Sequence, residues 1–251
     1  MQLKKKEIDF FKMHGWLRVK SFLNKNDTKS INNKINSFLK KNADKYTGRD
    51  INFVGNNKLI SKINSFHKLH DLNFIKKFSR TKKISWNVKK LLGSKELELK
   101  ASEYFAKPKK KGLYVPIHQD NFYWNIVDGN ALTLWIALTK SEKKNGAVFY
   151  YDKSHKNGVF DHKPSYAKGS SQTIKNINQI KKFKKITPKL DVGDVIFHHS
   201  NIVHGSPSNK SPVSRKGFTL QLKDKNSKYD KKLIKKYEKS LLKQVKSREI
   251  K

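Results

Sequence analysis

Apolar side chains in the N-terminal third of the chain follow a helical spacing. They recur three or four positions apart at Ile31, Ile35, Phe38 and Leu39, which places them on one face of a helix. Asn26 or Asp27 precedes this run and can cap it. A second helical stretch runs through residues 72–92 and ends at Gly93, a residue typical of helix C-termini. The pattern predicts a helical N-terminal part over about residues 1–93.

After Gly93 the apolar spacing changes to two, which is typical of strands. Alternation is visible from Leu97 to Ala106, and further strands are predicted at 113–119, 131–138, 146–151, 186–191, 194–199 and 216–222. Many short strands behind a helical segment favour a β-rich α+β fold. We predict a β-sandwich or jelly-roll core over about residues 94–225, flanked by helices.

The last residues, about 226–251, predict a basic C-terminal helix. Leu233, Tyr237, Leu241 and Leu242 share one side of it, which predicts packing against the core with a solvated opposite face. The chain shows neither an internal repeat nor a Pro- or Gly-rich linker. We therefore predict one domain that spans residues 1–251.

The charge of the chain is strongly positive. Among its 251 residues, 57 are Lys or Arg and 20 are Asp or Glu, a formal net charge of +37. Only five of the basic residues are Arg, whereas nucleic-acid readers use the Arg fork for base and phosphate contacts. We interpret the lysines as a solvated surface whose field favours an anionic small molecule, and we expect no nucleic-acid partner. A basic polyanion- or nucleic-acid-binding protein on a jelly-roll scaffold is the alternative, and it predicts strongly salt-dependent binding.

The remaining composition narrows the chemistry. Hydrophobic residues make up 35% of the chain, which is enough to build a core. The chain has no Cys, and this excludes disulfides, thiolate metal ligands and Cys nucleophiles. No run approaches the roughly 18 consecutive apolar residues of a membrane helix, and the basic start lacks the apolar run of a signal peptide. We expect a cytoplasmic protein whose chemistry rests on His, carboxylate, hydroxyl and basic groups.

The segment that carries candidate chemistry contains His118 and Asp120. These residues are two apart, so on an extended strand both side chains leave the same face. An imidazole beside a carboxylate is half of a two-His-one-carboxylate site, which binds Fe(II) and leaves coordination positions open. The alternative interpretation of such a short pair is a structural hydrogen bond, so a second His from a distant strand is needed.

The candidates for that second His lie after the turn at Gly193 and Asp194, where His198, His199 and His204 follow. His204 is favoured because Ser206 lies two residues later and Arg215 eleven residues later. A 2-oxoacid that chelates iron has a second carboxylate to anchor, and an Arg fork with a neighbouring hydroxyl suits it. Arg215 is notable as one of few Arg in a Lys-rich chain.

At these residues the sequence resembles the phytanoyl-CoA dioxygenase family of Fe(II)/2-oxoglutarate-dependent oxygenases. The resemblance covers about residues 5–225. Its central motifs are His118-Gln119-Asp120, followed by Tyr123-Trp124, then His204-Gly205-Ser206 and Arg215-Lys216-Gly217. Shorter matching segments lie at 15–19, 106–108, 135–138, 145–148, 154–158 and 193–197. The fold that the resemblance implies is a double-stranded β-helix, or jelly roll.

The resemblance implies specific roles. His118, Asp120 and His204 would be the iron ligands, and Arg215 and Ser206 would contact the distal carboxylate of 2-oxoglutarate. The reaction would be hydroxylation of a C–H bond of a small-molecule metabolite, with O2 consumed and 2-oxoglutarate decarboxylated to succinate and CO2. The carboxylate of Asp120 favours hydroxylation over halogenation, because related halogenases keep that position small.

Other positions near these motifs also receive predicted roles. Glu103 would face the co-substrate, although an acidic residue is not expected there, and His155 is expected to be structural rather than a ligand. For the substrate we predict contacts with Tyr123, Trp124, Trp135 and Lys107. Phe122 and Tyr114 are further candidates to line the pocket. The alternative interpretation, that each of these aromatic residues belongs to the core, is the stronger one. The small polar residues 165–172 predict a loop that closes as a lid.

Two further classes stay open. An oxygenase on the same scaffold could act on a macromolecule that the lysine surface guides to the metal. A cupin-like isomerase or hydrolase would use another metal and would need neither a 2-oxoacid nor oxygen. The sequence indicates no oligomeric state.

Overall fold

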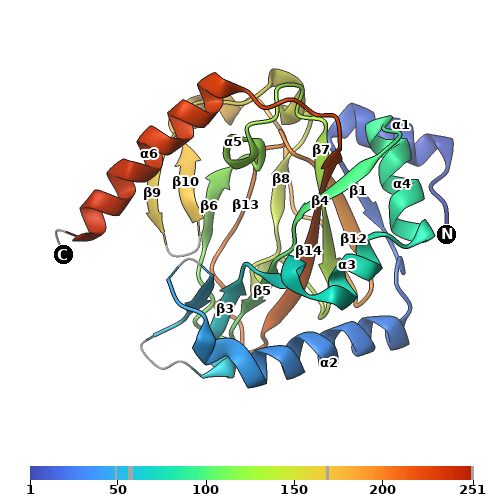
Figure 1. Ribbon diagram of the computed structural model, residues 1–251, viewed down its shortest axis with the longest axis vertical. Helices are drawn as coiled ribbons and strands as arrows, with labels where there is room; N and C mark the ends of the chain where they lie inside the picture. Colours follow the sequence, from blue (N-terminus) through green and yellow to red (C-terminus); the bar gives the residue numbers. More distant parts are fainter. Residues whose placement is uncertain (49, 56–58, 168–169, 250–251) are drawn as a thin grey trace.

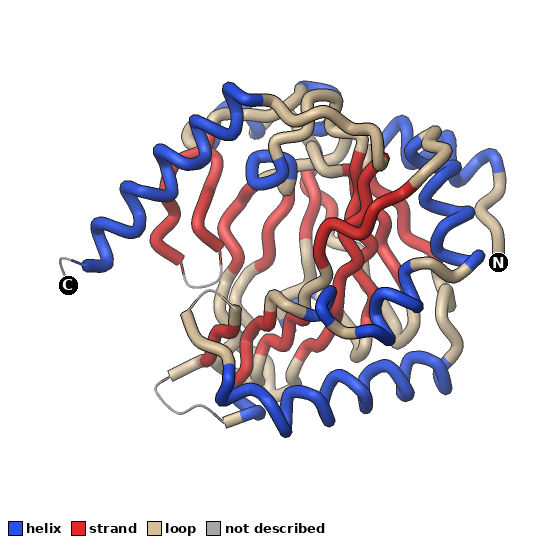
Figure 2. The backbone as a smooth tube through the Cα atoms, viewed as in Figure 1, coloured by secondary structure: helices blue, strands red, loops and turns tan. Residues whose placement is uncertain are grey.

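The computed structural model describes residues 1–48, 50–55, 59–167 and 170–249. Its centre consists of two facing antiparallel sheets with helices on the outside (Figures 1 and 2). The larger sheet contains, in spatial order, β1 (Trp16–Val19), β12 (Val195–His199), β7 (Ala131–Ala137), β14 (Arg215–Asp224), β5 (Tyr104–Lys107), β3 (Ile63–Phe66) and β2 (Ile51–Phe53), and β4 (Leu97–Ala101) pairs with β14. The smaller sheet contains β11 (Lys185–Ile186), β8 (Phe149–Tyr151), β13 (His204–Ser206) and β6 (Val115–His118). A separate hairpin consists of β9 (His162–Ala167) and β10 (Ser170–Ile174).

The helices lie around these sheets. They are α1 (Lys5–His14), α2 (Lys25–Asn42), α3 (Asn73–Ser79), α4 (Lys82–Leu92), α5 (Asn121–Trp124) and α6 (Lys231–Glu249). Single 3-10 turns are η1 (Ala43–Lys45), η2 (Ile60–Lys62), η3 (Leu69–Asp71), η4 (Lys143–Asn145), η5 (Ser154–Asn157) and η6 (Ile177–Ile180). Figure 1 shows α2 running along one side of the large sheet, α1 beside α4 near the N-terminus, and α6 beside the β9–β10 hairpin. None of the helices in the described ranges is long and apolar enough to cross a membrane.

The strand β7 shows how the large sheet separates the core from the interior of the roll. All seven of its residues are buried. Leu132, Leu134 and Ile136 belong to the main hydrophobic core, which the helices cover, whereas Thr133 and Trp135 face the central cavity between the sheets. Because successive side chains of a strand point to opposite faces, one strand supplies both environments. The alternation therefore fixes which residues can take part in chemistry.

The helical core is built as the spacing predicts. Ile31, Ile35 and Leu39 are buried on one face of α2 and join the main core. The helix begins one residue before Asn26, and its cap is Asn24, whose side chain accepts a hydrogen bond from the backbone N–H of Asp27. On α4, Ile84, Val88 and Leu91 are buried, and the helix ends at Gly93 in the left-handed conformation. These helices close the outer face of the large sheet.

The predicted fold class, a jelly-roll core with N-terminal helices and a C-terminal helix, is confirmed. The helical part predicted up to about residue 93 also contains the strands β1, β2 and β3, which join the large sheet. The strand predicted at 186–191 is wrong beyond Ile186. Pro188 has no N–H for a strand ladder, and Leu190 makes only an isolated bridge to Ser141.

The segment 165–172 differs from its prediction as well. It was expected to be a loop, but it belongs mostly to the hairpin of β9 and β10, with residues 168–169 outside the described part of the chain. The hydrogen-bonded register pairs Gln172 with Pro164 and Thr173 with Lys163. Small polar residues in this segment therefore form strands because a neighbouring strand satisfies their backbone groups.

Candidate active site

Three side chains that are far apart in sequence meet in the central cavity. His118 is the last residue of β6, Asp120 follows it before α5, and His204 begins β13. β13 pairs with β6 so that His204 lies directly opposite His118. The Nε2 atoms of both imidazoles lie 3.6 Å from Oδ1 of Asp120, and the candidate ligand atoms all lie within 4.8 Å of one another. The structure thus brings together the three residues predicted as metal ligands.

Backbone carbonyls set the orientation of the two imidazoles. Nδ1 of His118 lies 2.8 Å from the carbonyl oxygen of Pro116, and Nδ1 of His204 lies 3.0 Å from that of Ile202. Since a carbonyl can only accept, each Nδ1 carries the proton and donates it. The lone pairs on the Nε2 atoms therefore point to the carboxylate side of the site, as metal ligation by His requires.

The carboxylate of Asp120 is held by one of its two oxygens. Oδ2 accepts hydrogen bonds from the Thr133 hydroxyl at 2.8 Å and from Nε2 of His198 at 3.2 Å. Nδ1 of His198 lies 3.3 Å from the hydroxyl of Tyr150. Oδ1 is thereby left facing the two imidazoles. His198 was one of three candidates for the distal ligand, and the structure places it behind Asp120 as a hydrogen-bond donor.

The ionisation states suit a divalent metal. Burial lowers the pKa of His204 to about 3, so its imidazole is neutral at physiological pH. Burial opposes ionisation of Asp120, but the surrounding imidazoles of His204, His118 and His198 outweigh it and hold the pKa of the carboxyl well below its usual range. Two imidazoles and one carboxylate are the donor set of open Fe(II) sites. No other group of three such residues close enough to share a metal occurs in the described ranges.

Arg215 is a buried charge that lacks a counterion. Its side chain is 1% exposed at the start of β14. Nη2 donates to the carbonyl oxygen of Gly146 at 2.7 Å and to Oγ of Ser206 at 3.0 Å, and the guanidinium lies 5.0 Å from the centre of the Trp135 ring. Nε has no partner, and Arg215 makes no ion pair with any carboxylate among the described residues. Burial lowers its pKa only to about 10, so it stays charged at neutral pH.

A buried cation without a counterion is costly unless an anion joins it. Arg215 and Ser206 line the same cavity, of about 330 Å³, as the triad of His118, Asp120 and His204. The Ser206 hydroxyl donates to Gly146 at 2.7 Å, which fixes it beside the guanidinium. The arrangement can bind a carboxylate at one end of the cavity and a divalent metal further along it.

The predicted substrate contacts have different positions. Tyr123, Trp124 and Trp135 line the cavity, whereas Phe122 and Tyr114 do not belong to its lining. The cavity is also lined by residues that the sequence did not assign to it: Asn52 on β2, His67 after β3, Phe105 on β5, and Tyr237, Leu241 and Gln244 on α6. Tyr237 and Leu241 belong to the side of the helix that was predicted to pack, whereas Leu242, predicted with them, is 61% exposed.

Lys107 does not contact the cavity. Its side chain is 2% exposed, and Nζ donates to the carbonyl oxygens of Leu113 and Pro207, the latter at 2.7 Å. The alternation on β5 turns Lys107 inward, but its long side chain ends among backbone carbonyls at the junction of two loops. Its predicted role as a substrate contact does not fit this geometry, which gives it a structural role instead.

Glu103 and His155 also lie away from the Arg215 end. Glu103 Oε1 is 2.6 Å from Nδ1 of His67, so it does not face the predicted co-substrate position. His155 lies on η5 beside α1 and β12, where Nε2 lies 3.1 Å from the carbonyl oxygen of Lys12 and its ring is 5.3 Å from that of His199. Neither residue belongs to the triad.

Comparison with known proteins adds a family match. The model of the phytanoyl-CoA dioxygenase (PhyH) family matches residues 11–217. The chain is 30% identical over 172 residues to phytanoyl-CoA dioxygenase 1 of Oryza sativa subsp. japonica, covering 63% of this chain and 56% of that protein. It is 25% identical over 255 residues to phytanoyl-CoA dioxygenase of Arabidopsis thaliana, covering 86% and 87%. The chain thus spans little more than half the length of the rice relative.

Solved structures share the fold. The non-heme alpha ketoglutarate dependent carbocyclase SnoK superimposes with a TM-score of 0.72 at 18% identity, covering 90% of this chain and 86% of that one. EctD from S. alaskensis with 2-oxoglutarate and 5-hydroxyectoine gives a TM-score of 0.73 at 18% identity, covering 91% and 78%. At such low identity the likeness concerns the fold.

Substitution of the three His near the distal position distinguishes their roles. His204→Ala should abolish Mn(II) binding, measured by calorimetry without oxygen, because it removes a ligand. His198→Ala should weaken binding about 10- to 100-fold, because it removes a hydrogen bond to the ligand carboxylate. His199→Ala, one position along and outside the site, is the matched control and should keep the parent affinity. Retained binding in His204→Ala would contradict the assignment.

Lys107→Met tests the structural role of this lysine. The substitution leaves buried carbonyl oxygens without a donor, and we expect the free energy of unfolding in urea to fall by about 2 kcal/mol. Lys109→Met, at an exposed position on the same turn, should change it by less than about 0.5 kcal/mol. Equal stability of both variants would show that the carbonyl contacts of Lys107 are unimportant.

Proposed function

Because the chain belongs to the phytanoyl-CoA dioxygenase family, we propose that it is an Fe(II)- and 2-oxoglutarate-dependent dioxygenase that hydroxylates a C–H bond of a small molecule. The observation that carries the proposal is the pairing of two features in one cavity. A triad of two imidazoles and a carboxylate offers an open metal site, and a buried Arg215 without a counterion offers a carboxylate site. A metal-bound dicarboxylate is the ligand that satisfies both.

Different residues of the cavity would bind the metal and the co-substrate. His118, Asp120 and His204 would hold the iron, and Arg215 with Ser206 would hold the distal carboxylate of 2-oxoglutarate. When bound, iron and 2-oxoglutarate supply the oxidising chemistry, in which O2 is consumed and the co-substrate yields succinate and CO2. Thr133 and His198 keep Asp120 in place through its Oδ2, so that Oδ1 stays available.

The remaining walls of the cavity would orient the substrate and exclude water. Tyr123 and Trp124 from α5 and Tyr237 and Leu241 from α6 line the cavity. Aromatic and aliphatic side chains in this part of the wall lower the local dielectric and strengthen the polar contacts inside. The described volume of about 330 Å³ suits a small molecule together with the co-substrate rather than a polymer. We therefore favour a small-molecule substrate over a macromolecular one.

The β9–β10 hairpin contains most of the segment 165–172 that was predicted to act as a lid, and it lies beside α6 at the cavity. The backbone N–H of Gln172 donates to the hydroxyl of Tyr123 at 3.0 Å, and Oε1 of Gln172 accepts from the Ser240 hydroxyl at 2.7 Å. These contacts link the hairpin, α5 and α6. We propose that the three elements move together when substrate enters.

Binding of 2-oxoglutarate tests the proposed function. In calorimetry with Mn(II) and without oxygen, Arg215→Ala should bind 2-oxoglutarate about 100-fold more weakly than the parent, because the distal carboxylate loses a buried charged partner. Its Mn(II) affinity should be retained. The parent protein with Fe(II) should form succinate from 2-oxoglutarate only when O2 is admitted. Equal 2-oxoglutarate affinity in both proteins would reject the assigned co-substrate site.

A further inference from the structure

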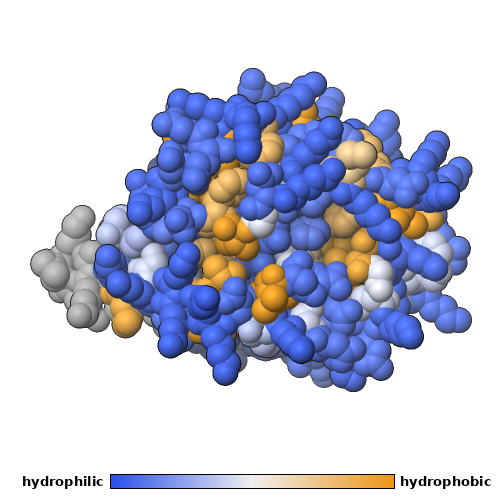
Figure 3. All heavy atoms as spheres, turned by 90° about the horizontal axis from the view of Figure 1, so that it is seen from above, coloured by the Kyte–Doolittle hydropathy of each residue, from blue (hydrophilic) through white to orange (hydrophobic). Residues whose placement is uncertain are grey.

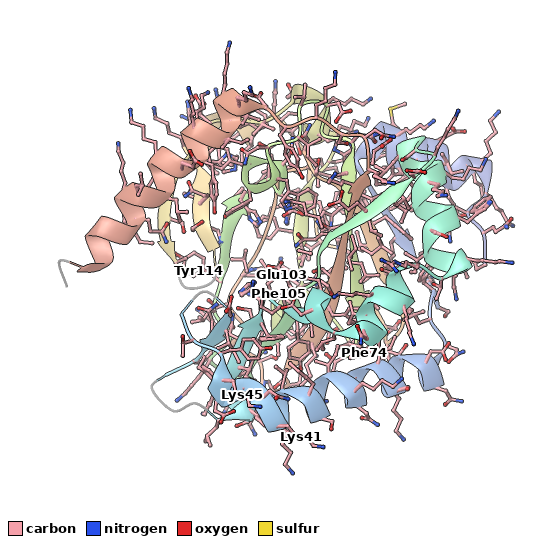
Figure 4. The ribbon with its side chains drawn as sticks, in the orientation of Figure 1. Lys41, Lys45, Phe74, Glu103, Phe105 and Tyr114 are labelled. Atoms are coloured by element: carbon pink, nitrogen blue, oxygen red, sulfur yellow. The ribbon has the colours of Figure 1, made fainter. Side chains whose placement is uncertain are left out.

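A second polar cluster lies in the same cavity as the triad. Glu103, just before β5, has Oε1 2.6 Å from Nδ1 of His67 and accepts at Oε2 from the Gln221 amide at 2.9 Å. Asn52 lies 3.2 Å from Nε2 of His67. All four of these side chains line the cavity. Figure 4 labels Glu103 and Phe105 in the middle of the molecule.

The strand β14 relates this cluster to the co-substrate site. Arg215, Thr219 and Gln221 face the cavity from the same strand, and Gln221 lies about 20 Å from Arg215 at about 3.4 Å per residue. Gln221 lies opposite Thr133 on the neighbouring strand β7, and the Thr133 hydroxyl donates to Asp120. Because Gln221 also donates to Glu103, the Glu103 carboxylate is held near the level of the triad and not at the Arg215 end of the strand. This part of the cavity is where the primary substrate must fit if 2-oxoglutarate occupies the Arg215 end.

The charge of the cavity is opposite to that of the surface. Lysine side chains point outward around the molecule, as Lys41 and Lys45 do in Figure 4, and hydrophilic residues dominate the face in Figure 3. Among the described residues that line the cavity there is no Lys, and Arg215 is the single permanent cation. Apart from the ligand Asp120, Glu103 is the single carboxylate there. An anionic substrate would have no cationic partner in the cavity, because Arg215 would already bind 2-oxoglutarate.

Hydrogen bonds hold the ring of His67 beside Glu103. Nδ1 of His67 donates to Oε1 of Glu103, because a carboxylate oxygen accepts. Nε2 lies 3.2 Å from the Asn52 amide nitrogen and 2.9 Å from the Ser65 hydroxyl, and these contacts fix the ring. His67 thus orients the carboxylate of Glu103.

Glu103 has room for another partner. A carboxylate offers about four acceptor positions, and His67 and Gln221 occupy two of them. The side chain is 22% exposed within the cavity wall. The ring of Phe105, which also lines the cavity and packs edge-on against His67 at 6.0 Å between centres, can contact a cation through its face.

We propose that the primary substrate is an amine, whose ammonium group binds Glu103 while the carbon to be hydroxylated lies at the triad. The inference rests on the proposed function, because it assigns the Arg215 side of the cavity to 2-oxoglutarate. It replaces the expectation of an anionic substrate, which came from the net charge of +37. The lysines determine the electrostatic field outside the molecule, whereas the side chains of the cavity wall select the substrate.

Three probes of the same ring size test the inference: cyclohexylamine, cyclohexanol and cyclohexanecarboxylate. Their binding to the full chain, loaded with Zn(II) and 2-oxoglutarate, is measured by ligand-observed NMR titration. The amine should bind at least about tenfold more tightly than either other probe, as a charge-assisted hydrogen bond to a partly buried carboxylate predicts. Equal or tighter binding of the carboxylate would overturn the proposal.

Two variants assign the preference to the proposed residue. Glu103→Gln keeps the size and most hydrogen bonds but removes the charge, and it should abolish the preference for the amine. Glu103→Asp keeps the charge and should retain a reduced preference, which guards against an effect of misfolding. Preserved amine selectivity in Glu103→Gln would reject Glu103 as the recognition group. Failure of 2-oxoglutarate to bind the parent protein would instead reject the proposed function, so the two failures are distinguishable.

Discussion

The two carboxylate oxygens of Asp120 have different roles, and the metal site depends on this difference. Oδ2 is held by the Thr133 hydroxyl and by His198, and this leaves Oδ1 facing the lone pairs of His118 and His204. If the carboxylate rotated freely, neither of its oxygens would be held in the position of a metal ligand. Because the two donors come from β7 and β12 of the large sheet, while both imidazoles come from the small sheet, the metal site depends on how the two sheets face each other.

The same facing of sheets arranges the whole cavity. On β14, residues that alternate with core residues present first Arg215, then Thr219 and Gln221 to the interior. One strand thus connects a cationic end, the neighbourhood of the triad and the cluster around Glu103. Helices α1 to α4 pack on the other face of the large sheet, whereas α5 and α6 line the cavity. The side chains that build the hydrophobic core and those that line the cavity therefore leave opposite faces of the same strand.

Much of this site could be predicted from the sequence, because its signals are local. His118 and Asp120 are two residues apart, His204 and Ser206 are two residues apart, and Arg215 opens the next strand. His67 and Asn52 could not be predicted. Asn52 lies on β2 and His67 directly follows β3, two strands of three and four residues inside a mostly helical segment. Their position depends on the pairing of β3 with β5 some forty residues later. Lys107 shows what strand alternation cannot predict. Alternation gives the face of the strand from which a side chain leaves, but not the position of the charged group at the end of a long side chain.

The central claim is that His118, Asp120 and His204 bind one metal ion, and anomalous diffraction tests it most directly. Crystals would be grown without oxygen in Mn(II) and 2-oxoglutarate, with data collected above the manganese absorption edge. The account predicts one strong anomalous peak within bonding distance of Nε2 of His118, Oδ1 of Asp120 and Nε2 of His204. A cavity without a peak at that position, or a peak coordinated by other residues, would contradict it.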